Sequence, residues 1–237
     1  VRCAIVLSGA WTLGGWLRGI VLSGLAWNPI GSTWVAVEPV LQTAAVTGVY
    51  GLTMLTVLTG ASAAVIKPGR RASYLLPGAC AIFLMLVWAA GANRLANISG
   101  DQYVAGVNLR LVQPNIEQTH KWREELRVAQ LTKYLELSRR VGNPAPTHVI
   151  WPETATPFYL AHEPRLRRVL ADIVPPAGAL ITGALRSSDP GEIPPRIWNS
   201  LHALDSSGAI IATFDKFHLV PFGEYMPLRS VVGIAKL

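Results

Sequence analysis

Residues 39–66 read PVLQTAAVTGVYGLTMLTVLTGASAAVI and contain no charged side chain. A membrane-spanning helix needs about 20 predominantly apolar residues, so this stretch is long enough to cross a bilayer with some tilt. A short basic loop, KPGRR (67–71), follows it, and residues 74–93 again carry no charge. The pattern predicts two membrane spans that are joined by this loop.

The sequence before these two spans is also apolar. Residues 3–17 form a run that is short for a complete span, which fits a span whose beginning is missing. The chain starts at Val1 rather than at a methionine, and no signal peptide precedes the apolar region. We therefore expect residues 1–100 to be a partial transmembrane helical region.

The basic residues predict the orientation of these spans. Short cytoplasmic loops are rich in Lys and Arg, so KPGRR is expected on the cytoplasmic side. Residues 19–38 and the chain after residue 94 then lie on the opposite, extracytoplasmic face.

The charge composition changes at about residue 100. The first hundred residues contain six basic residues and one acid, whereas residues 101–237 contain 15 basic residues and 13 acids, an ordinary mixture for a globular domain. Most of the net charge of +7 therefore belongs to the apolar half, where basic residues flank spans. For that reason we expect a membrane and no nucleic acid as a partner.

Residues 101–237 predict an α/β domain. The runs 121–141 and 163–174 have apolar residues at helical spacing, and DSSG (205–208) is a hairpin signal between two strand-like runs. The alternation of strands and helices, followed by a hairpin, favours a layered sheet over a pure barrel. The strand-like runs are residues 104–113, 147–153, 178–185, 196–205 and 208–216.

Two charged residues stand at the ends of apolar strand-like runs. Glu153 ends HVIWPE, where an open α/β sheet places its functional sites and where poor solvation suits a carboxylate to accept a proton. Lys216 ends GAIIATFDK, from which an ammonium can stabilise an oxyanion. A capping or surface glutamate and a lysine on an edge strand are the structural alternatives.

Residues 214–227, FDKFHLVPFGEYMP, add two further polar side chains to an apolar turn. Glu224 can hold Lys216 or act as a second base, and an ordinary loop ion pair is the alternative. His218 is interpreted as structural, because no G-x-S-x-G motif accompanies it.

Four motifs in this order resemble those of the nitrilase superfamily, and specifically of the apolipoprotein N-acyltransferase family. They are VQPNI…KW, IWPETATP, ITGAL…WNSLHALDSSG and DKFHLVPFGEYMP. The apolar stretches WLRGIVLSGLAWNPIGSTW and LQTAAVTGVYGL resemble the membrane part of that family, so the likeness covers nearly the whole chain.

The resemblance implies a fold and a site. The fold is a set of transmembrane helices followed by an α/β nitrilase-like (α-β-β-α) sandwich domain, here residues 101–237. The site is a Glu-Lys-Cys triad, with Glu153 as base, Lys216 as lysine, Glu224 as a further essential glutamate and Trp122 near the mouth that admits substrate. Neither a cofactor nor a metal is implied.

The resemblance places the nucleophilic cysteine downstream of HLVPFGE, whereas the two cysteines of this chain, Cys3 and Cys80, lie in apolar runs upstream. Cysteines buried in apolar surroundings are inert, and their spacing suggests neither a disulfide nor a metal site. We therefore expect a fragment that is truncated at both ends, with an incomplete sandwich and no activity alone. A natural pseudoenzyme is the alternative.

The implied activity is the transfer of an acyl chain from a phospholipid, through a cysteine thioester, to the α-amine of a diacylglyceryl apolipoprotein in the bacterial inner membrane. The catalytic domain would lie on the extracytoplasmic face. Two other functions stay open from the residues: a membrane-tethered amidase of the nitrilase type and a non-catalytic lipoprotein-binding module.

Overall fold

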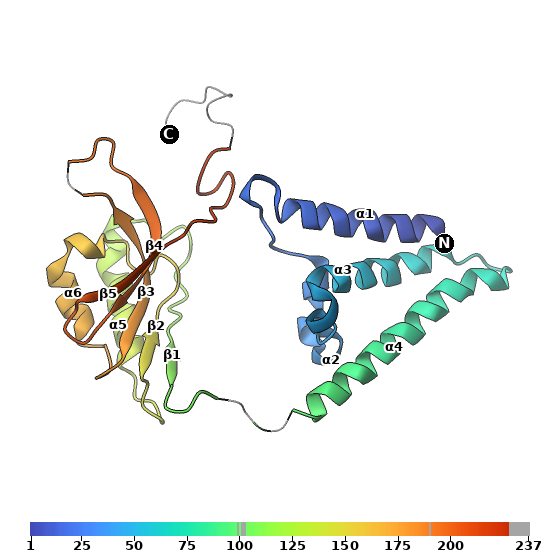
Figure 1. Ribbon diagram of the computed structural model, residues 1–237, viewed down its shortest axis with the longest axis horizontal. Coiled ribbons are helices and arrows are strands. Elements are labelled where there is room, and N and C mark those ends of the chain that lie inside the picture. The colour runs from blue at the N-terminus through green and yellow to red at the C-terminus, as the bar shows by residue number, and fades with distance from the viewer. Residues whose placement is uncertain (99, 101–102, 190, 228–237) are drawn as a thin grey trace. The chain divides into compact units, whose positions relative to one another are not determined.

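A computed structural model describes residues 1–98, 100, 103–189 and 191–227 of the chain (Figure 1). The structure divides into two compact units. The first is Val1–Asp101 together with His218–Leu237, and the second is Gln102–Phe217. The assignment of residues 101–237 to a catalytic domain stays a prediction.

The first unit is helical. Two stretches of its helices, Ala44–Val65 and Arg71–Ala96, are long and apolar enough to cross a membrane by length and composition. They match the two predicted spans. Its elements are α1 (Arg2–Arg18), η1 (Val21–Ser23), η2 (Ile30–Ala36), α2 (Glu38–Leu41), α3 (Ala44–Ser62), η3 (Ala63–Val65), η4 (Arg71–Tyr74) and α4 (Leu75–Ala96).

The predicted span at residues 39–66 is not one continuous helix. α2 ends at Leu41 and α3 begins at Ala44, after a turn. Within α3, Gly48 has φ 68°, a conformation that leaves the helix and that glycine adopts at no steric cost. The first part of the predicted span is therefore a separate short helix.

Apolar side chains lie both where these helices pack against one another and on their exposed surfaces. Val40, Leu52 and Leu55 form a small core against Leu84 and Val87. Many other large apolar side chains are exposed, including Val46 (82%), Leu75 (73%) and Met85 (62%). Helices that are apolar on all sides are typical of lipid-facing segments.

Hydrogen bonds join the segment that begins at His218 to the N-terminal part of the first unit. The hydroxyl of Ser23 donates to the carbonyl of Leu219 at 2.7 Å, and the hydroxyl of Tyr225 donates to the carbonyl of Leu22 at 2.5 Å. The stretch 214–227 is thus divided, because Lys216 belongs to the second unit and Glu224 to the first.

The second unit contains one five-stranded mixed sheet with strand order β1-β2-β3-β4-β5. β1, β2 and β3 are parallel, and β4 and β5 are each antiparallel to the preceding strand. The hairpin predicted at DSSG is confirmed. The strands are β1 (Leu109–Leu111), β2 (His148–Ile150), β3 (Ala179–Ser187), β4 (Ile197–Leu204) and β5 (Ile210–Asp215).

The first predicted strand was too long, because only Leu109–Leu111 of residues 104–113 pair with a neighbouring strand. The predicted helix at 121–141 also begins later, with a turn at Glu124–Leu126 before α5 (Arg127–Arg139). The second predicted helix is α6 (Pro164–Ala171), with its proline at the first position as expected.

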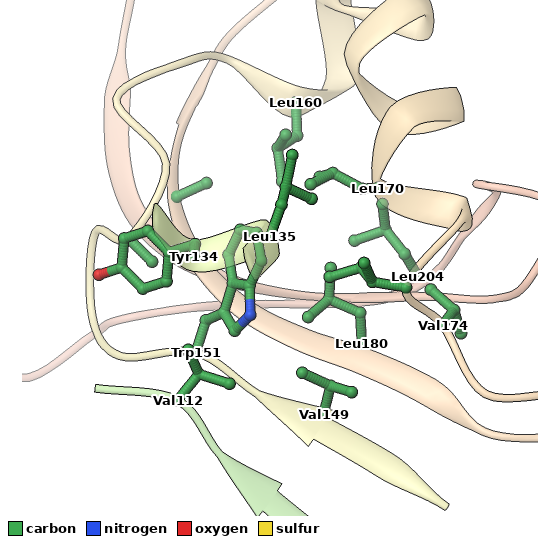
Figure 2. Close-up of a cluster of buried hydrophobic side chains, with 13 residues drawn as sticks. Val112, Tyr134, Leu135, Val149, Trp151, Leu160, Leu170, Val174, Leu180 and Leu204 are labelled. Atoms are coloured by element: carbon green, nitrogen blue, oxygen red, sulfur yellow. The ribbon is translucent and has the colours of Figure 1, made fainter. Parts of the chain in front are cut away.

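The core of the second unit lies between one face of the sheet and the helices α5 and α6 (Figure 2). Val149, Leu180 and Leu204 come from this face, since they are register partners across β2, β3 and β4. Tyr134 from α5 stacks on Trp151, with ring centroids 4.6 Å apart. This packing holds Trp151, the residue directly after β2, against the core.

The opposite face of the sheet presents exposed apolar side chains. Leu109, Leu111, Leu201 and Phe214 are 57%, 73%, 43% and 57% exposed. The described residues form a mixed α/β layer with one sheet, so the two-sheet sandwich implied by the resemblance stays a prediction.

Candidate active site

Glu153 lies just beyond the carboxyl end of β2, in an irregular turn against β3. The backbone N–H of Gly183 donates to the carbonyl of Pro152 at 3.3 Å, and the N–H of Ala155 donates to the carbonyl of Gly183 at 2.8 Å. In a regular parallel pair, the N–H and the C=O of one residue bond to two residues of the neighbouring strand that are two positions apart. Pro152 and Ala155 are three positions apart, so the segment after β2 contains one extra residue. We call residues 152–155 the Glu153 bulge; bulges of this kind re-aim side chains next to active sites.

Lys216 directly follows β5 and reaches Glu153. Its backbone N–H donates to the carbonyl of Asn199 at 2.8 Å, which extends the pairing of β5 with β4 by one residue. Its Nζ lies 3.0 Å from Oε1 of Glu153, and the two side chains are 31% and 57% exposed. The structure therefore brings together the two charged residues that were predicted as base and oxyanion stabiliser.

Asn199 is a third polar member of this cluster, which sequence reasoning missed. Its Nδ2 donates a hydrogen bond to the same oxygen, Oε1 of Glu153, that Lys216 contacts. The only signal in the sequence is the alternation of WNSLHAL, which places Asn199 and Leu201 on one face of β4.

A cleft of about 210 Å³ lies beside this cluster. Glu153, Lys216 and Asn199 form its polar part, and the side chains of Leu201 and Phe214 contribute an apolar wall. An anionic carboxylate beside a fixed ammonium can accept a proton from a nucleophile while the ammonium stabilises a developing oxyanion.

A second cavity, of about 380 Å³, lies on the other side of the Glu153 bulge, and Lys121 lines it. The ammonium of Lys121 donates to the backbone carbonyl of Glu153 at 3.0 Å. The predicted mouth residue Trp122 is next in the chain and is 51% exposed. Its role near the substrate mouth stays a prediction.

Beneath Lys216, an ion pair fixes the end of β5. Arg186 on β3 donates to both carboxylate oxygens of Asp215, at 2.9 and 2.5 Å, and Ser200 donates to the same carboxylate at 2.6 Å. The Arg186 hydrogen bond holds the pKa of Asp215 below its usual range. The guanidinium also lies 3.8 Å above the ring of Trp198.

The remaining candidates lie in the first unit. The carboxylate of Glu224 accepts a hydrogen bond from the backbone N–H of Val220 at 2.9 Å, which closes its own turn. Cys3 on α1 is exposed and Cys80 on α4 is buried. Within the described residues, no three His, Cys, Asp or Glu side chains gather in a way that could hold a metal ion.

Comparison with known proteins yields one consistent family. Residues 1–62 match the model of the apolipoprotein N-acyltransferase N-terminal domain. Curated proteins named apolipoprotein N-acyltransferase are 37% identical in Bradyrhizobium diazoefficiens, 37% in Rhodopseudomonas palustris and 39% in Allorhizobium ampelinum. These matches cover 96%, 93% and 92% of this chain, but only 44%, 43% and 42% of the relatives. The chain thus spans less than half the length of the curated relatives.

Proposed function

The chain belongs to the apolipoprotein N-acyltransferase family, and on that basis we propose that the protein containing it N-acylates bacterial lipoproteins. The acyl donor is a phospholipid, and the acceptor is the α-amine of an N-terminal diacylglyceryl-cysteine. The observation that supports this proposal most directly is the 3.0 Å contact between Lys216 and Glu153, the two residues that match the family motif.

The first half of the proposed reaction forms a thioester. The carboxylate of Glu153 takes the proton from a cysteine thiol, which the resemblance places downstream of this chain. The thiolate attacks the ester carbonyl of the phospholipid, and the ammonium of Lys216 stabilises the tetrahedral oxyanion. The intermediate then expels the lysophospholipid alkoxide, which takes the proton from Glu153.

The second half transfers the acyl group to the lipoprotein. The α-amine of the acceptor attacks the thioester and gives a proton to Glu153, and the second tetrahedral intermediate expels the thiolate. The proton on Glu153 returns to the sulfur, so the enzyme is regenerated. Division of one difficult amide formation into two steps through a covalent intermediate predicts ping-pong kinetics.

The proposed fold and placement follow the same reasoning. The sheet beside which Glu153 and Lys216 lie belongs to the second unit, Gln102–Phe217, and we propose that this sheet is half of a nitrilase-like sandwich. The basic loop KPGRR, between the two apolar stretches Ala44–Val65 and Arg71–Ala96, would face the cytoplasm. The sheet would then lie on the extracytoplasmic side, where both lipid substrates present their headgroups.

The test uses the full-length coding sequence that contains these residues, with a phospholipid and a diacylated lipopeptide as substrates. Glu153→Gln and Lys216→Ala should each abolish N-acylation while the protein still inserts into the membrane. Glu136→Gln and Lys133→Ala are matched controls, because both residues are exposed on α5. Retained activity in either site variant would refute the proposed roles.

Mass spectrometry of the products separates acyl transfer from hydrolysis. An N-acylated lipopeptide supports the proposal, whereas free fatty acid with unchanged lipopeptide would indicate a nitrilase-type hydrolase. Binding of the lipopeptide without either product would indicate a binding module.

A further inference from the structure

We propose that Gly183 is a positioning residue, which holds the carboxylate of Glu153 within reach of Lys216 by leaving room for the Glu153 bulge. This inference rests on the proposed function, since it assigns Gly183 to the same site. Gly183 lies in the middle of β3 and its backbone forms hydrogen bonds with both ends of the bulge, Pro152 and Ala155. Glycine inside a strand often marks a place where another segment of backbone approaches closely.

The bulge occupies the space that a side chain on Gly183 would need. A Cβ atom at this position would lie 2.5 Å from the backbone nitrogen of Thr154, 2.7 Å from Cα of Glu153 and 2.8 Å from the carbonyl oxygen of Pro152. All three atoms are backbone, so no rotation of a side chain relieves the contact. Any residue other than glycine at 183 therefore requires the bulge to move.

The bulge itself is held in an unusual conformation. Thr154 is 7% exposed and has φ 50°, a left-handed conformation that costs a non-glycine residue free energy. From the other side, the ammonium of Lys121 donates to the carbonyl of Glu153 at 3.0 Å. A strained turn whose second half, Thr154 and Ala155, is buried and which has contacts on both sides has few alternative positions, which suits it to fix a reacting group.

Displacement of the bulge moves Glu153 away from its partners. The side chain of Glu153 reaches past β3 to Asn199 on β4 and to Lys216 after β5. Gly183 is the register partner of Leu201, and both lie on the face of the sheet that Glu153 crosses. A Cβ at Gly183 thus pushes the base away from the oxyanion stabiliser without changing either catalytic side chain.

The experiment compares Gly183→Ala with Gly178→Ala in the full-length protein. Gly178 lies directly before β3, five residues before Gly183 in the chain. A Cβ atom at Gly178 would lie 1.8 Å from the carbonyl oxygen of Thr147, so alanine there also meets backbone, in this case that of the segment before β2. Both variants disturb the same pair of strands. We expect Gly183→Ala to lower kcat for acyl transfer about 100-fold with little change in KM, and Gly178→Ala to leave kcat near the wild-type value.

The pH profile distinguishes a positioning role from general destabilisation. A thiol ionises without help as the pH rises through about 8.5, so an enzyme with a misplaced base recovers at alkaline pH. We expect the deficit of Gly183→Ala to shrink there. A deficit that is constant with pH, or equal losses in the two glycine variants, would overturn the proposal.

A second variant decides the matter if Gly183→Ala does not accumulate. Lys121→Met removes the hydrogen bond to the Glu153 carbonyl at a partly exposed position, and we expect a three- to tenfold loss, roughly one hydrogen bond, with the same alkaline recovery. Wild-type kinetics in Lys121→Met would then overturn the proposal. Wild-type protein and Glu153→Gln, measured alongside, separate the ideas. If the wild type does not N-acylate the lipopeptide, the proposed function fails, and if Glu153→Gln is active, the role of Glu153 as base fails. If Glu153→Gln is inactive and Gly183→Ala is fully active, only the positioning role fails.

Discussion

Arg186 donates two hydrogen bonds, of 2.9 and 2.5 Å, to the carboxylate of Asp215, and Asp215 directly precedes Lys216 in the chain. The pair joins β3 to β5 across β4, and its side chains are 29% and 33% exposed. It therefore fixes the end of the strand from which Lys216 reaches Glu153.

This ion pair predicts a pH dependence of stability. The pKa of Asp215 is lowered by its hydrogen bond with Arg186, so its contribution to the free energy of unfolding is present above the unfolded value near 3.9. The contribution is lost as the pH falls through the lower folded-state pKa, because the protonated carboxyl no longer pairs with Arg186. Asp215→Asn should lower stability by about 1–3 kcal/mol at neutral pH and make it less sensitive to acid.

Thermal unfolding of the full-length protein in detergent, followed from neutral pH to about pH 3, measures this effect. Asp172→Asn provides the control, since Asp172 is exposed at the end of α6. Equal acid sensitivity of Asp215→Asn and the wild type would contradict the assignment.

Asn199 predicts a distinct effect on catalysis. Its Nδ2 donates to Oε1 of Glu153, so Asn199→Ala removes one of the groups that orient the proposed base. We expect about a tenfold loss of kcat, roughly the value of one hydrogen bond to a charged group. Asn199→Asp should lose more, because a second carboxylate repels Glu153 and competes for Lys216. Steady-state kinetics with the lipopeptide would contradict this if Asn199→Asp is at least as active as Asn199→Ala.

The order of strands and helices was predictable from the sequence, whereas the fine geometry of the site was not. Alternating and helical patterns located every strand of the sheet and both helices, because those patterns reflect which face is buried. Glu153 and Lys216 could be singled out because each ends an apolar strand-like run, whereas their catalytic roles come from the motif resemblance and stay predictions. Asn199 and Gly183 could not be singled out, because their roles depend on the register of β4 and on a backbone contact between segments about 30 residues apart.

The break before α3 and the late start of β1 have similar causes. Apolar composition over residues 39–66 indicates burial in lipid or protein, but it does not show where a turn interrupts the helix. Residues 104–108 alternate like a strand, yet a strand exists only where a neighbour pairs with it, and β2 supplies only three partners.

The hydrogen bond between Trp151 and Ser138 predicts that loss of its acceptor lowers the free energy of unfolding. Nε1 of Trp151 donates to Oγ of Ser138 at 2.9 Å, and both residues are buried in the core of the second unit. Ser138→Ala leaves the indole N–H without its acceptor and should destabilise the protein by about 1–3 kcal/mol. The double variant Ser138→Ala/Trp151→Phe removes donor and acceptor together, so its loss should be smaller than the sum of the single losses. Thermal unfolding of the four proteins tests this, and strict additivity would contradict it.

For the same substitution, glycine to alanine, opposite outcomes are expected at Gly91 and at Gly78, which lie on one apolar helix, α4. A Cβ at Gly91 on α4 would lie 1.8 Å from the carbonyl oxygen of Pro39 on α2, whereas a Cβ at Gly78 meets nothing within 4 Å. Gly91→Ala therefore forces α2 and α4 apart and should lower the thermal stability of the protein in detergent. Gly78→Ala should leave stability unchanged or raise it by up to about 1 kcal/mol, because alanine favours the helix more than glycine does. Both residues lie on α4, so a general sensitivity of this helix to alanine would lower the stability of both variants. Equal losses in the two variants would therefore contradict the prediction, because they would show that the contact with Pro39 does not hold α2 against α4.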